Sequence, residues 1–511
     1  MSNLSQIQML AQVAVEVDGA ALSPEDGRTL GEVRVQQRLS LPALCELRFF
    51  DPTGGLAEAT TMRAGMSLRV AVVGHEEPLF VGQVTAVEHI YEPSGGLETR
   101  VRGYDRLHQL RKRQPVRAHV ELNLADLMRE IVSDLGLSVD AGESGPVWKR
   151  LIQHKQSDFD LLVEVAERSG LYFTLRGDTL HVLTLDGIGE FLPLMRGETL
   201  FEARIELNGD TACRTVSTIG WDPLRVEKHG GRADTARVGR VIAAEVSPDN
   251  LGGTGERVLV NETVQDDRQA DALAQSELDA RAARETTLWG MAEGDPRLRP
   301  GTPVLVRGIA SPLAGQYVLT GVDHTVDAVK GFVSEITSEP PARRTRERGT
   351  LTALGIVTHV GDPEGFGRVQ VSLPTYNDVE TDWLGVLIAG AGAGKGMVAL
   401  PDVGDTVLVL FVNGDPSQGI VLGGLYGVQT QADWDWGIEA GAVKRYTLLT
   451  PGGQRVKLDD ALELVRIENS DGSFIEMSPD KVVLHAQRRL EIDAPGQQVI
   501  IRGQTIDFER A

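Results

Sequence analysis

Residues 355–427 carry the feature that most constrains the fold, a series of short apolar runs separated by turn residues. Dipeptides such as Asp362-Pro363 and Gly404-Asp405 lie between the runs and are typical of tight turns. The predicted strands span residues 356–360, 368–373, 383–388, 397–400, 406–412 and 420–425. Five or six short strands in about 70 residues predict a closed barrel of the OB type.

The residues at the turns of this barrel are predicted to hold its shape and to perform no chemistry. The set consists of Gly367, Arg368, Pro401, Gly404, Asp405, Gly414, Asp415 and Pro416. OB barrels that bind single-stranded nucleic acid use basic grooves, but this barrel has two basic residues, Arg368 and Lys395, against eight acidic ones. The charge balance excludes nucleic acid as a partner and favours a structural barrel.

A glycine-rich run at residues 390–396 invites comparison with nucleotide-binding loops. A P-loop requires Gly-x4-Gly-Lys-Ser/Thr, but Ala389 stands at the first glycine position and Gly396 follows Lys395. A dinucleotide-binding loop must lead into a helix, whereas this run leads into a predicted strand. The ten histidines are scattered, and no pair has the spacing of metal ligands. The sequence predicts no catalytic residue, no cofactor and no metal site.

Length and charge limit the class of protein further. The chain has 511 residues, enough for three or four domains, and a net charge of −22. No segment approaches the ~18 apolar residues of a membrane helix, and residues 1–12 lack the basic flank of a secretory signal. Cys45 and Cys213 form no metal or redox motif and are expected to be buried thiols. These features predict residence in the cytoplasm, at least at first, without stable membrane insertion.

Residues 1–342 predict a mainly β body with an α/β insert at residues 111–200. Alternating apolar and polar residues predict strands before and after the insert. Within it, Asn123 and Ser157 are predicted to cap helices that end at Gly136 and Gly170. A hairpin that turns at residues 177–178 follows. A longer helix is predicted near residues 268–288, with a buried side formed by Ala270, Leu273, Ala274, Leu278 and Ala282.

Residues 343–354 are predicted to be a linker before the barrel. Pro340-Pro341 and the arginines that follow are typical of a solvated connector between domains. The alternative is that these arginines contact an acidic surface, which this acidic chain could itself supply.

The tail, residues 446–511, shows an apolar period of eight at Leu484, Ile492, Ile500 and Phe508. One chain with this pattern has too few apolar residues to bury a core, so its faces must stack on neighbours. Three chains wound together would bury one stripe from each, which predicts an intertwined trimeric β-prism. Residues 428–445 form the connector to it. The indoles of Trp434 and Trp436 are expected to cover the junction of barrel and prism, or else to contact a cargo or tip protein.

Several motifs, in this order along the chain, resemble those of the VgrG family, the spike and hub proteins of contractile injection systems. The resemblance covers nearly the whole chain. In the hub part the motifs are VRGYDRL at 101–107, QSDFDLL at 156–162, GQYVL at 315–319, Asp323-His324 and Gly331-Phe332. In the barrel they are Gly367-Arg368-Val369, PDVGD at 401–405 and Gly414-Asp415-Pro416.

The resemblance implies a homotrimer whose hub part docks the inner tube protein. Each chain would supply two tube-type β-barrels, at residues 1–110 and 201–342, followed by the OB barrel and the prism. It also implies baseplate proteins as partners, a PAAR-type tip protein at the C-terminal end, and effector or toxin cargo in some members. Such a particle would be assembled in the bacterial cytoplasm and delivered or released outside the cell on firing.

The resemblance also leaves alternatives. The expected function is a non-enzymatic spike and hub, because only about 20 residues separate barrel and prism, too few for the lysozyme domain of some phage relatives. Three residues follow Phe508, so no fused effector is expected, and His485 lacks the His-x-His partner of iron-binding tips. A cell-wall hydrolase spike is the competing hypothesis. The compact chain favours an extracellular phage-tail-like particle, with a type VI secretion VgrG or a phage tail spike as alternatives.

Overall fold

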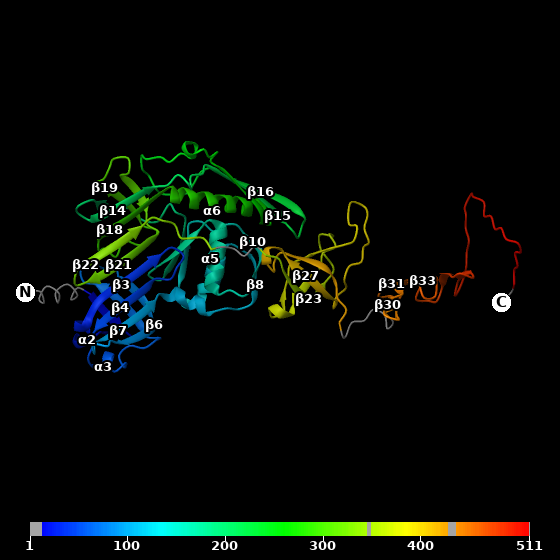
Figure 1. Ribbon diagram of the computed structural model, residues 1–511, viewed down its shortest axis with the longest axis horizontal. Helices are drawn as coiled ribbons and strands as arrows, with labels where there is room; N and C mark the ends of the chain where they lie inside the picture. The colour runs from blue at the N-terminus through cyan, green and yellow to red at the C-terminus, as the bar shows by residue number, and fades with distance from the viewer. Residues whose placement is uncertain (1–12, 345–348, 428–435, 510–511) are drawn as a thin grey trace, which may run out of the picture. The chain divides into compact units, whose positions relative to one another are not determined.

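The computed structural model describes residues 13–344, 349–427 and 436–509. The chain divides into two compact units, Met1–Gly424 and Leu425–Ala511. Figure 1 shows the helices and strands of both units with their labels. The larger unit contains a mainly β hub with an α/β insert and, after it, a small barrel.

An eleven-stranded sheet forms the centre of the hub, in the order β14-β18-β22-β21-β3-β4-β7-β6-β5-β1-β2. Its strands are β1 (Val13–Val17), β2 (Ala20–Ala21), β3 (Leu30–Arg38), β4 (Leu44–Phe50), β5 (Ser67–Val72), β6 (Phe80–Tyr91), β7 (Leu97–Tyr104), β14 (Leu200–Leu207), β18 (Thr286–Glu293), β21 (Gly321–Asp327) and β22 (Gly331–Thr337). The short helices α2 (Pro24–Thr29) and α3 (Gly54–Ala57) lie between its first strands. Strands from both predicted tube-type barrels therefore belong to one continuous curled sheet, which the antiparallel pair β3 and β21 joins.

Buried and exposed residues alternate along the strands, so the two faces of this sheet differ in polarity. On β3, Val33 and Val35 are buried in the core, whereas Arg34 lies on the outer face. At the seam between the two halves, the buried carboxylate of Asp323 accepts hydrogen bonds from Arg34 Nη2 and Gln36 Nε2, each at 3.0 Å. Burial opposes ionisation of Asp323, but the hydrogen bonds from the β3 side chains outweigh it and lower the pKa. Charge therefore holds the two halves together at their junction.

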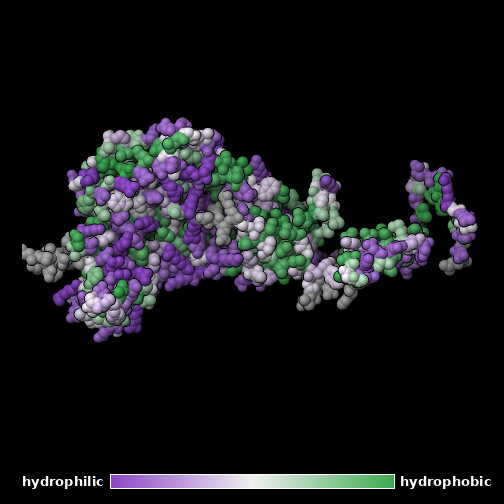
Figure 2. Space-filling model, viewed as in Figure 1, coloured by the Kyte–Doolittle hydropathy of each residue, from purple (hydrophilic) through white to green (hydrophobic). Residues whose placement is uncertain are grey.

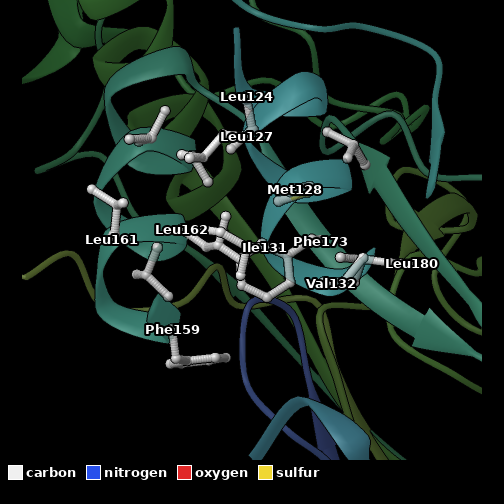
Figure 3. Packing of buried hydrophobic residues seen from close by; sticks show 14 of the residues in the cluster. Leu124, Leu127, Met128, Ile131, Val132, Phe159, Leu161, Leu162, Phe173 and Leu180 are labelled. Atoms are coloured by element: carbon white, nitrogen blue, oxygen red, sulfur yellow. The ribbon is translucent and has the colours of Figure 1, made fainter. Parts of the chain in front are cut away.

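The α/β insert follows the first half of the sheet. It contains η1 (Arg106–Lys112), β8 (Arg117–Leu122), α4 (Leu124–Val132), η2 (Ser133–Leu135), β9 (Ser138–Ala141), β10 (Trp148–Gln153), α5 (Asp158–Ser169), β11 (Tyr172–Arg176) and β12 (Thr179–Leu183). Both predicted caps are confirmed, since Asn123 accepts from the N–H of Asp126 and Ser157 forms a capping box with Asp160. Gly136 and Gly170 end the helical segments with positive φ, as predicted. The apolar faces of α4 and α5 meet the hairpin of β11 and β12 around Phe173 (Figure 3).

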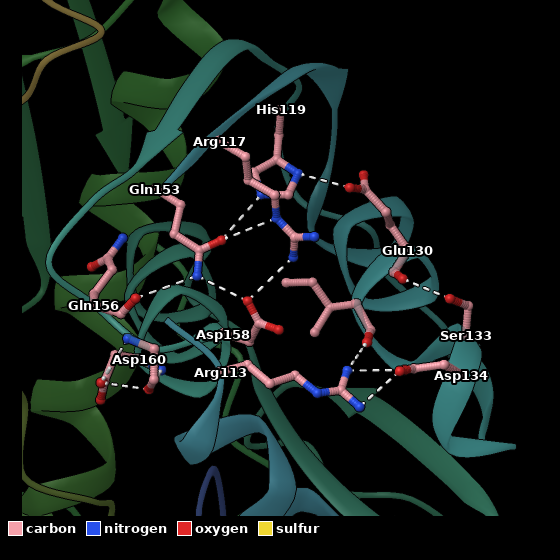
Figure 4. Close-up of polar contacts among 12 residues, drawn as sticks. Arg113, Arg117, His119, Glu130, Ser133, Asp134, Gln153, Gln156, Asp158 and Asp160 are labelled. Atoms are coloured by element: carbon pink, nitrogen blue, oxygen red, sulfur yellow. Dashed lines mark hydrogen bonds and ion pairs between the residues drawn. The ribbon is translucent and has the colours of Figure 1, made fainter. Parts of the chain in front are cut away.

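A buried polar network ties the strands of the insert to α5 (Figure 4). Asp158 Oδ1 accepts from Gln153 Nε2 at 2.9 Å and from Arg117 Nη2 at 3.2 Å. His119, also buried, lies with Nδ1 3.1 Å from the Glu130 carboxylate. Buried polar groups that satisfy one another in this way fix the relative positions of the elements that carry them.

The second half of the hub adds the long helix α6 (Asp267–Glu285) and two three-stranded sheets, β16-β15-β17 and β13-β19-β20. Its other elements are β13 (Leu192–Met195), β15 (Thr215–Asp222), β16 (Glu227–Ala233), η3 (Pro248–Leu251), β17 (Glu256–Thr263), β19 (Pro303–Arg307) and β20 (Gly315–Val318). The five apolar positions predicted for the buried side of α6 are all buried. The predicted end at residue 288 is wrong, because the β-branched Thr286 and Thr287 already belong to β18.

The small barrel is a six-stranded sheet in the order β25-β24-β23-β27-β28-β26. Its elements are β23 (Leu351–His359), β24 (Gln370–Leu373), η4 (Pro374–Tyr376), β25 (Val379–Glu380), β26 (Gly385–Val386), β27 (Thr406–Phe411), η5 (Val412–Gly414) and β28 (Gly419–Gly424). Residues 397–400, predicted as a strand, are exposed and form no strand, so that prediction is wrong. The first strand begins at Leu351, inside the predicted linker.

The second unit is a single antiparallel layer. Its strands are β29 (Ile438–Glu439), β30 (Ala442–Val443), β31 (Arg445–Leu449), β32 (Arg455–Asp459), β33 (Leu464–Glu468), β34 (Phe474–Met477) and β35 (Val482–His485). The last five form a meander in sequence order. No helix or strand occurs in residues 486–509, the last described stretch of the chain.

Candidate functional site

The meander of the second unit has one apolar face. Because side chains alternate across a strand, cross-strand pairs such as Leu448 with Val456 and Ile467 with Ile475 all lie on the same side. The residues of this face are Tyr446, Leu448, Val456, Leu458, Val465, Ile467, Ile475, Met477, Val482 and Leu484. Most are largely exposed in the single chain, up to 72% at Val482. We call this surface the tail face.

The opposite side of the same sheet is charged and internally paired. Arg466 lies 2.6 Å from the Glu468 carboxylate and 2.8 Å from that of Glu476. Lys457 lies 3.1 Å from the Asp459 carboxylate. A sheet one layer thick with an apolar side must bury that side against another layer. The tail face is therefore an unpartnered assembly surface.

The predicted prism residues occupy different places. Leu484 lies on β35 at the end of the tail face, whereas Ile492, Ile500 and Phe508 follow the last strand and are exposed in the single chain. The rest of the tail face was not predicted from the period of eight. The period-two alternation of the runs at residues 455–459 and 464–468 would have indicated it.

The barrel is apolar on both sides of its sheet. Its interior is filled by residues such as Val357, Val407 and Phe411, which are buried. Outward on the same strands lie Leu354 and Ile356 of β23, 49% and 41% exposed. The half-exposed residues of β27 and β28 that continue this surface are Leu408, Leu410, Ile420 and Leu422. Figure 2 shows apolar surface gathered over the barrel. This outer face of the barrel is a second candidate assembly surface.

The predicted turn residue Arg368 forms a buried ion pair with Asp362, and Gly367 directly precedes it. Arg368 donates from Nε and Nη2 to the two oxygens of Asp362, at 2.9 and 2.8 Å. Their side chains are only 6% and 2% exposed. The hydrogen bond from Arg368 and those from nearby backbone N–H groups lower the pKa of Asp362 well below its usual range. Gly365 and Gly367 have positive φ, which allows the loop to fold over the pair.

The other predicted turn residues lie at the two ends of β27. Gly404, with φ 92°, donates to the Val357 carbonyl, and Asp405 Oδ2 accepts from the N–H of Asp402 at 2.8 Å. After β27, Asp415 Oδ1 accepts from the backbone N–H and the hydroxyl of Ser417. Pro401 precedes the first of these turns, and Gly414 and Pro416 lie in the second. These hydrogen bonds are local and stabilise the turns.

The glycine-rich run forms an exposed hairpin loop. Gly392 and Lys395 exchange backbone hydrogen bonds at 3.1 Å, and Gly390 and Gly394 have positive φ. An extended, exposed segment follows at residues 397–400. A phosphate site at a helix N-terminus needs a helix after the loop, and this loop does not supply one.

Hub and barrel meet in a packed joint. Leu224, in the turn between β15 and β16, belongs to the hydrophobic core of the barrel. Beside it, Arg225 pairs with Glu364, which also contacts Arg368. On the other side of the joint, Arg150 Nη1 donates to the Glu380 carbonyl at 2.7 Å. These contacts hold the hub against the barrel.

The linker arginines bind the hub. Arg343 Nη1 lies 2.8 Å from Glu277 of α6, and Arg344 Nη1 lies 2.7 Å from Asp160 of α5. Both arginines remain exposed, as expected of a connector, and both contact acidic side chains of the same chain, in agreement with the alternative. Residues 345–348 lie outside the described residues, as does Trp434. Trp436 packs edge-on against Tyr426 with ring centroids 5.1 Å apart.

The described residues contain neither a metal-ligand cluster nor a helix that could cross a membrane. In residues 13–344, 349–427 and 436–509, no group of three or more His, Cys, Asp or Glu side chains is arranged to hold a metal ion. Within the same ranges, no helix has the length and apolar content needed to cross a bilayer. Cys45 and Cys213 are buried and unbonded to each other, as expected.

Comparison with known proteins places the chain in a class. Residues 353–426 match the model of the type VI secretion system/phage-baseplate injector OB domain. Residues 10–328 match the model of the Alg8 N-terminal domain. The type VI secretion system spike protein VgrG1c of Pseudomonas aeruginosa is 22% identical over 414 residues, which cover 73% of this chain and 55% of that protein. The chain spans about half the length of such curated relatives.

Solved structures show the same fold. The E. coli c3393 protein, described as a type VI secretion component similar to the T4 tail proteins gp27 and gp5, aligns with TM-score 0.54 and 13% identity over 81% of this chain and 99% of its own. The lidded Francisella PdpA-VgrG complex aligns with TM-score 0.56 and 8% identity over 93% of this chain and 80% of its own. The chain belongs to the Alg8 N-terminal domain family, carries a baseplate-injector OB domain, and is similar to VgrG spike proteins and phage-baseplate hubs.

Proposed function

We propose that the protein is the non-enzymatic central spike and hub of a contractile injection system and works as a homotrimer. The observation that carries the proposal is the tail face, a continuous apolar surface across five strands of a one-layer sheet. Three such sheets, each turning its tail face inward, would enclose a common core and leave the paired charges outside. Ile492, Ile500 and Phe508 would extend that core toward the C-terminal end.

The energy available for this assembly is large. Burying one Leu, Ile or Met side chain contributes about 1.5 kcal/mol or more. Ten residues on the tail face therefore supply on the order of 10 kcal/mol per chain even when part of the surface stays wet. The outer face of the barrel adds to the same assembly. A trimer would have a net charge of 3 × −22 = −66. A large net charge keeps such a particle soluble.

The hub would dock the inner tube and the baseplate. The similarity to spike proteins of type VI secretion systems supports this role. One solved relative is described in complex with PdpA, which is consistent with further partners at the hub. We propose a PAAR-type tip protein at the end of the prism, effector or toxin as cargo, assembly in the bacterial cytoplasm, and delivery outside the cell on firing. The eight barrel turn residues act by holding the joint in shape.

Sedimentation equilibrium or native mass spectrometry of the full chain tests the proposal. We expect a stable trimer, and expect Ile467→Asp to dissociate it because a carboxylate would enter the common core. Val329→Asp is the matched control, since Val329 is 90% exposed in a hub turn outside both candidate surfaces. A monomer or dimer of the unchanged chain would refute the assembly, as would a trimer that Ile467→Asp leaves intact.

A further inference from the structure

A cavity of about 590 Å3 opens in the hub between several segments that are far apart in sequence. The start of β6 and the residue before it supply Phe80 and Leu79, the end of β11 supplies Arg176, and the loop before β19 supplies Arg299. The volume lies in the range of ordinary ligand sites. Neither the barrel nor the tail face contributes to it, so the cavity is separate from the assembly surfaces described above.

Arg176 is the unusual group of this cavity. Its Nη2 donates to the Pro300 carbonyl at 2.9 Å and to the Thr302 hydroxyl at 3.1 Å, but its buried Nε has no hydrogen-bond partner. Among the described residues, no carboxylate forms an ion pair with Arg176. Burial and the positive charge of Arg299 lower the pKa of Arg176 to about 10, whereas the negative charge of Glu77 opposes the shift.

Three carboxylates line the cavity: Glu77, Asp105 and the exposed Glu190. Glu77 pairs with Arg299 at 3.0 Å. Both oxygens of Asp105 accept backbone N–H groups, from Ala43 at 2.7 Å and Leu107 at 2.9 Å. Burial also raises the pKa of Asp105 to about 7, so near neutral pH it carries only part of a charge. Of the three arginines that line the cavity, Arg297 pairs with Asp295 and Arg299 with Glu77, which leaves Arg176 without a carboxylate partner among the described residues.

The rest of the lining is largely apolar. Leu79 and Phe80 form one wall, and Ile188 and Leu192 form another. Val81, 47% exposed, stands at the rim. A bare inorganic anion would leave these walls in contact with water. A peptide segment that combines one carboxylate with apolar neighbours would instead match both parts of the site.

We propose that this cavity binds an acidic peptide segment of a partner protein, with a carboxylate on Arg176 and apolar side chains against Leu79 and Ile188. The inference goes beyond the proposed function and does not depend on trimer formation. The carboxylate can come from a Glu or Asp side chain or from a chain terminus, because a guanidinium binds both alike.

Calorimetric titration of the full chain with three peptides distinguishes these sources. The peptides are acetyl-Leu-Glu-Leu-amide, acetyl-Leu-Gln-Leu-amide and acetyl-Leu-Gln-Leu with a free terminal carboxylate. We expect the first to bind about tenfold more tightly than the second, the gain from one charge-assisted contact. Tighter binding of the third than of the first would assign the site to a chain terminus, and the reverse order would assign it to a side-chain carboxylate. Equal affinity of all three would overturn the proposal.

Single substitutions test whether the peptide binds at Arg176. Arg176→Gln should reduce the affinity for the Glu peptide to that of the Gln peptide, whereas Arg204→Gln should change nothing, because Arg204 is 77% exposed on β14 and does not line the cavity. If Arg176→Gln lowers the melting temperature, Val81→Asp at the exposed rim provides a second test. This variant should also lower the affinity for the Glu peptide. The proposal fails if neither variant weakens binding or if inorganic phosphate binds as well as the peptide. It also fails if Arg176→Gln lowers the oligomer mass, since the cavity would then be a contact between copies.

Discussion

The buried pair of Asp362 and Arg368 allows a quantitative test of how the barrel turn is held. Replacing Arg368 with methionine keeps the length of the side chain and removes its charge and both of its bonds to Asp362. The carboxylate, 2% exposed, then stays buried without its counter-ion. Removing one partner of a buried ion pair typically costs 3–5 kcal/mol.

The lower end of this range applies here. After the substitution, the N–H groups of Glu364 and Phe366 still donate to the Asp362 carboxylate, at 3.1 and 2.9 Å. These two bonds compensate part of the lost interaction, so we expect a destabilisation of about 3 kcal/mol. Since 1.4 kcal/mol corresponds to a factor of ten, the loop should open roughly 150-fold more often.

Hydrogen exchange followed by mass spectrometry measures this opening in the full chain. Peptides that cover residues 360–373 should lose protection in Arg368→Met by about two orders of magnitude. The matched control is Arg129→Met, which removes an exposed arginine that pairs with Asp126 at 2.8 Å on α4. Exposed pairs of this kind contribute at most about 1 kcal/mol. A loss in Arg368→Met no larger than that in the control would refute the reasoning.

Acid provides an independent check of the same pair. The Arg368 hydrogen bonds lower the pKa of Asp362 in the folded state, so the carboxylate stabilises the fold above its unfolded pKa of about 3.9. That contribution is lost as the pH falls below this value toward the folded pKa. In Arg368→Met the acid-dependent part should shrink. An unchanged pH profile between pH 5 and 2 would contradict the assignment.

Three further predictions concern the hub and the joint. Leu224→Ala should destabilise the barrel by about 2–5 kcal/mol, because it opens a cavity in the barrel core; a calorimetric melt should show the barrel transition shifted down and the rest unchanged. Gly355→Val should destabilise it by more than about 1–3 kcal/mol, since even a Cβ there would lie 2.1 Å from Val371 Cγ1; Gly361→Ala, with open space around it, is the control. Burial lowers the pKa of His324 to about 4, so stability should fall by about 3 kcal/mol as the pH drops from 6.5 to 4, and His324→Gln should reduce that fall in denaturant titrations.

The elements that could be predicted from the sequence are those that local contacts determine. Asn123 and Ser157 cap helices because a side-chain oxygen reaches an N–H three residues later. The strands of the barrel alternate apolar and turn residues over short distances, so five of the six predicted runs contain a strand or part of one. Local information failed at residues 397–400, where an apolar run has no neighbouring strand to pair with.

Features that depend on distant pairing could not be predicted. The two halves of the hub are joined by the pairing of β3 with β21. Arg34 and Asp323, which meet there, are separated in sequence by nearly the whole length of the hub. The binding of Arg343 to Glu277 likewise depends on where the chain returns after α6. A run of arginines gives the same sequence pattern whether it is solvated or paired, so only the position of the acidic partner decides between the two.

The two assembly surfaces have a mechanical consequence when they are considered together with the joint. Leu224 is buried in the barrel core, and Arg150 and Arg225 bind the barrel on either side of it. The hub and the barrel therefore cannot separate without exposing a core residue and breaking these contacts. If the apolar outer face of the barrel packs against two other copies, as we propose, the hub of each chain is fixed in the same assembly. Force applied at the hub would then reach the barrel through packed side chains and not through the linker. The residues at this joint, more than the turn glycines predicted from sequence, are where substitutions should weaken transmission while leaving each part folded.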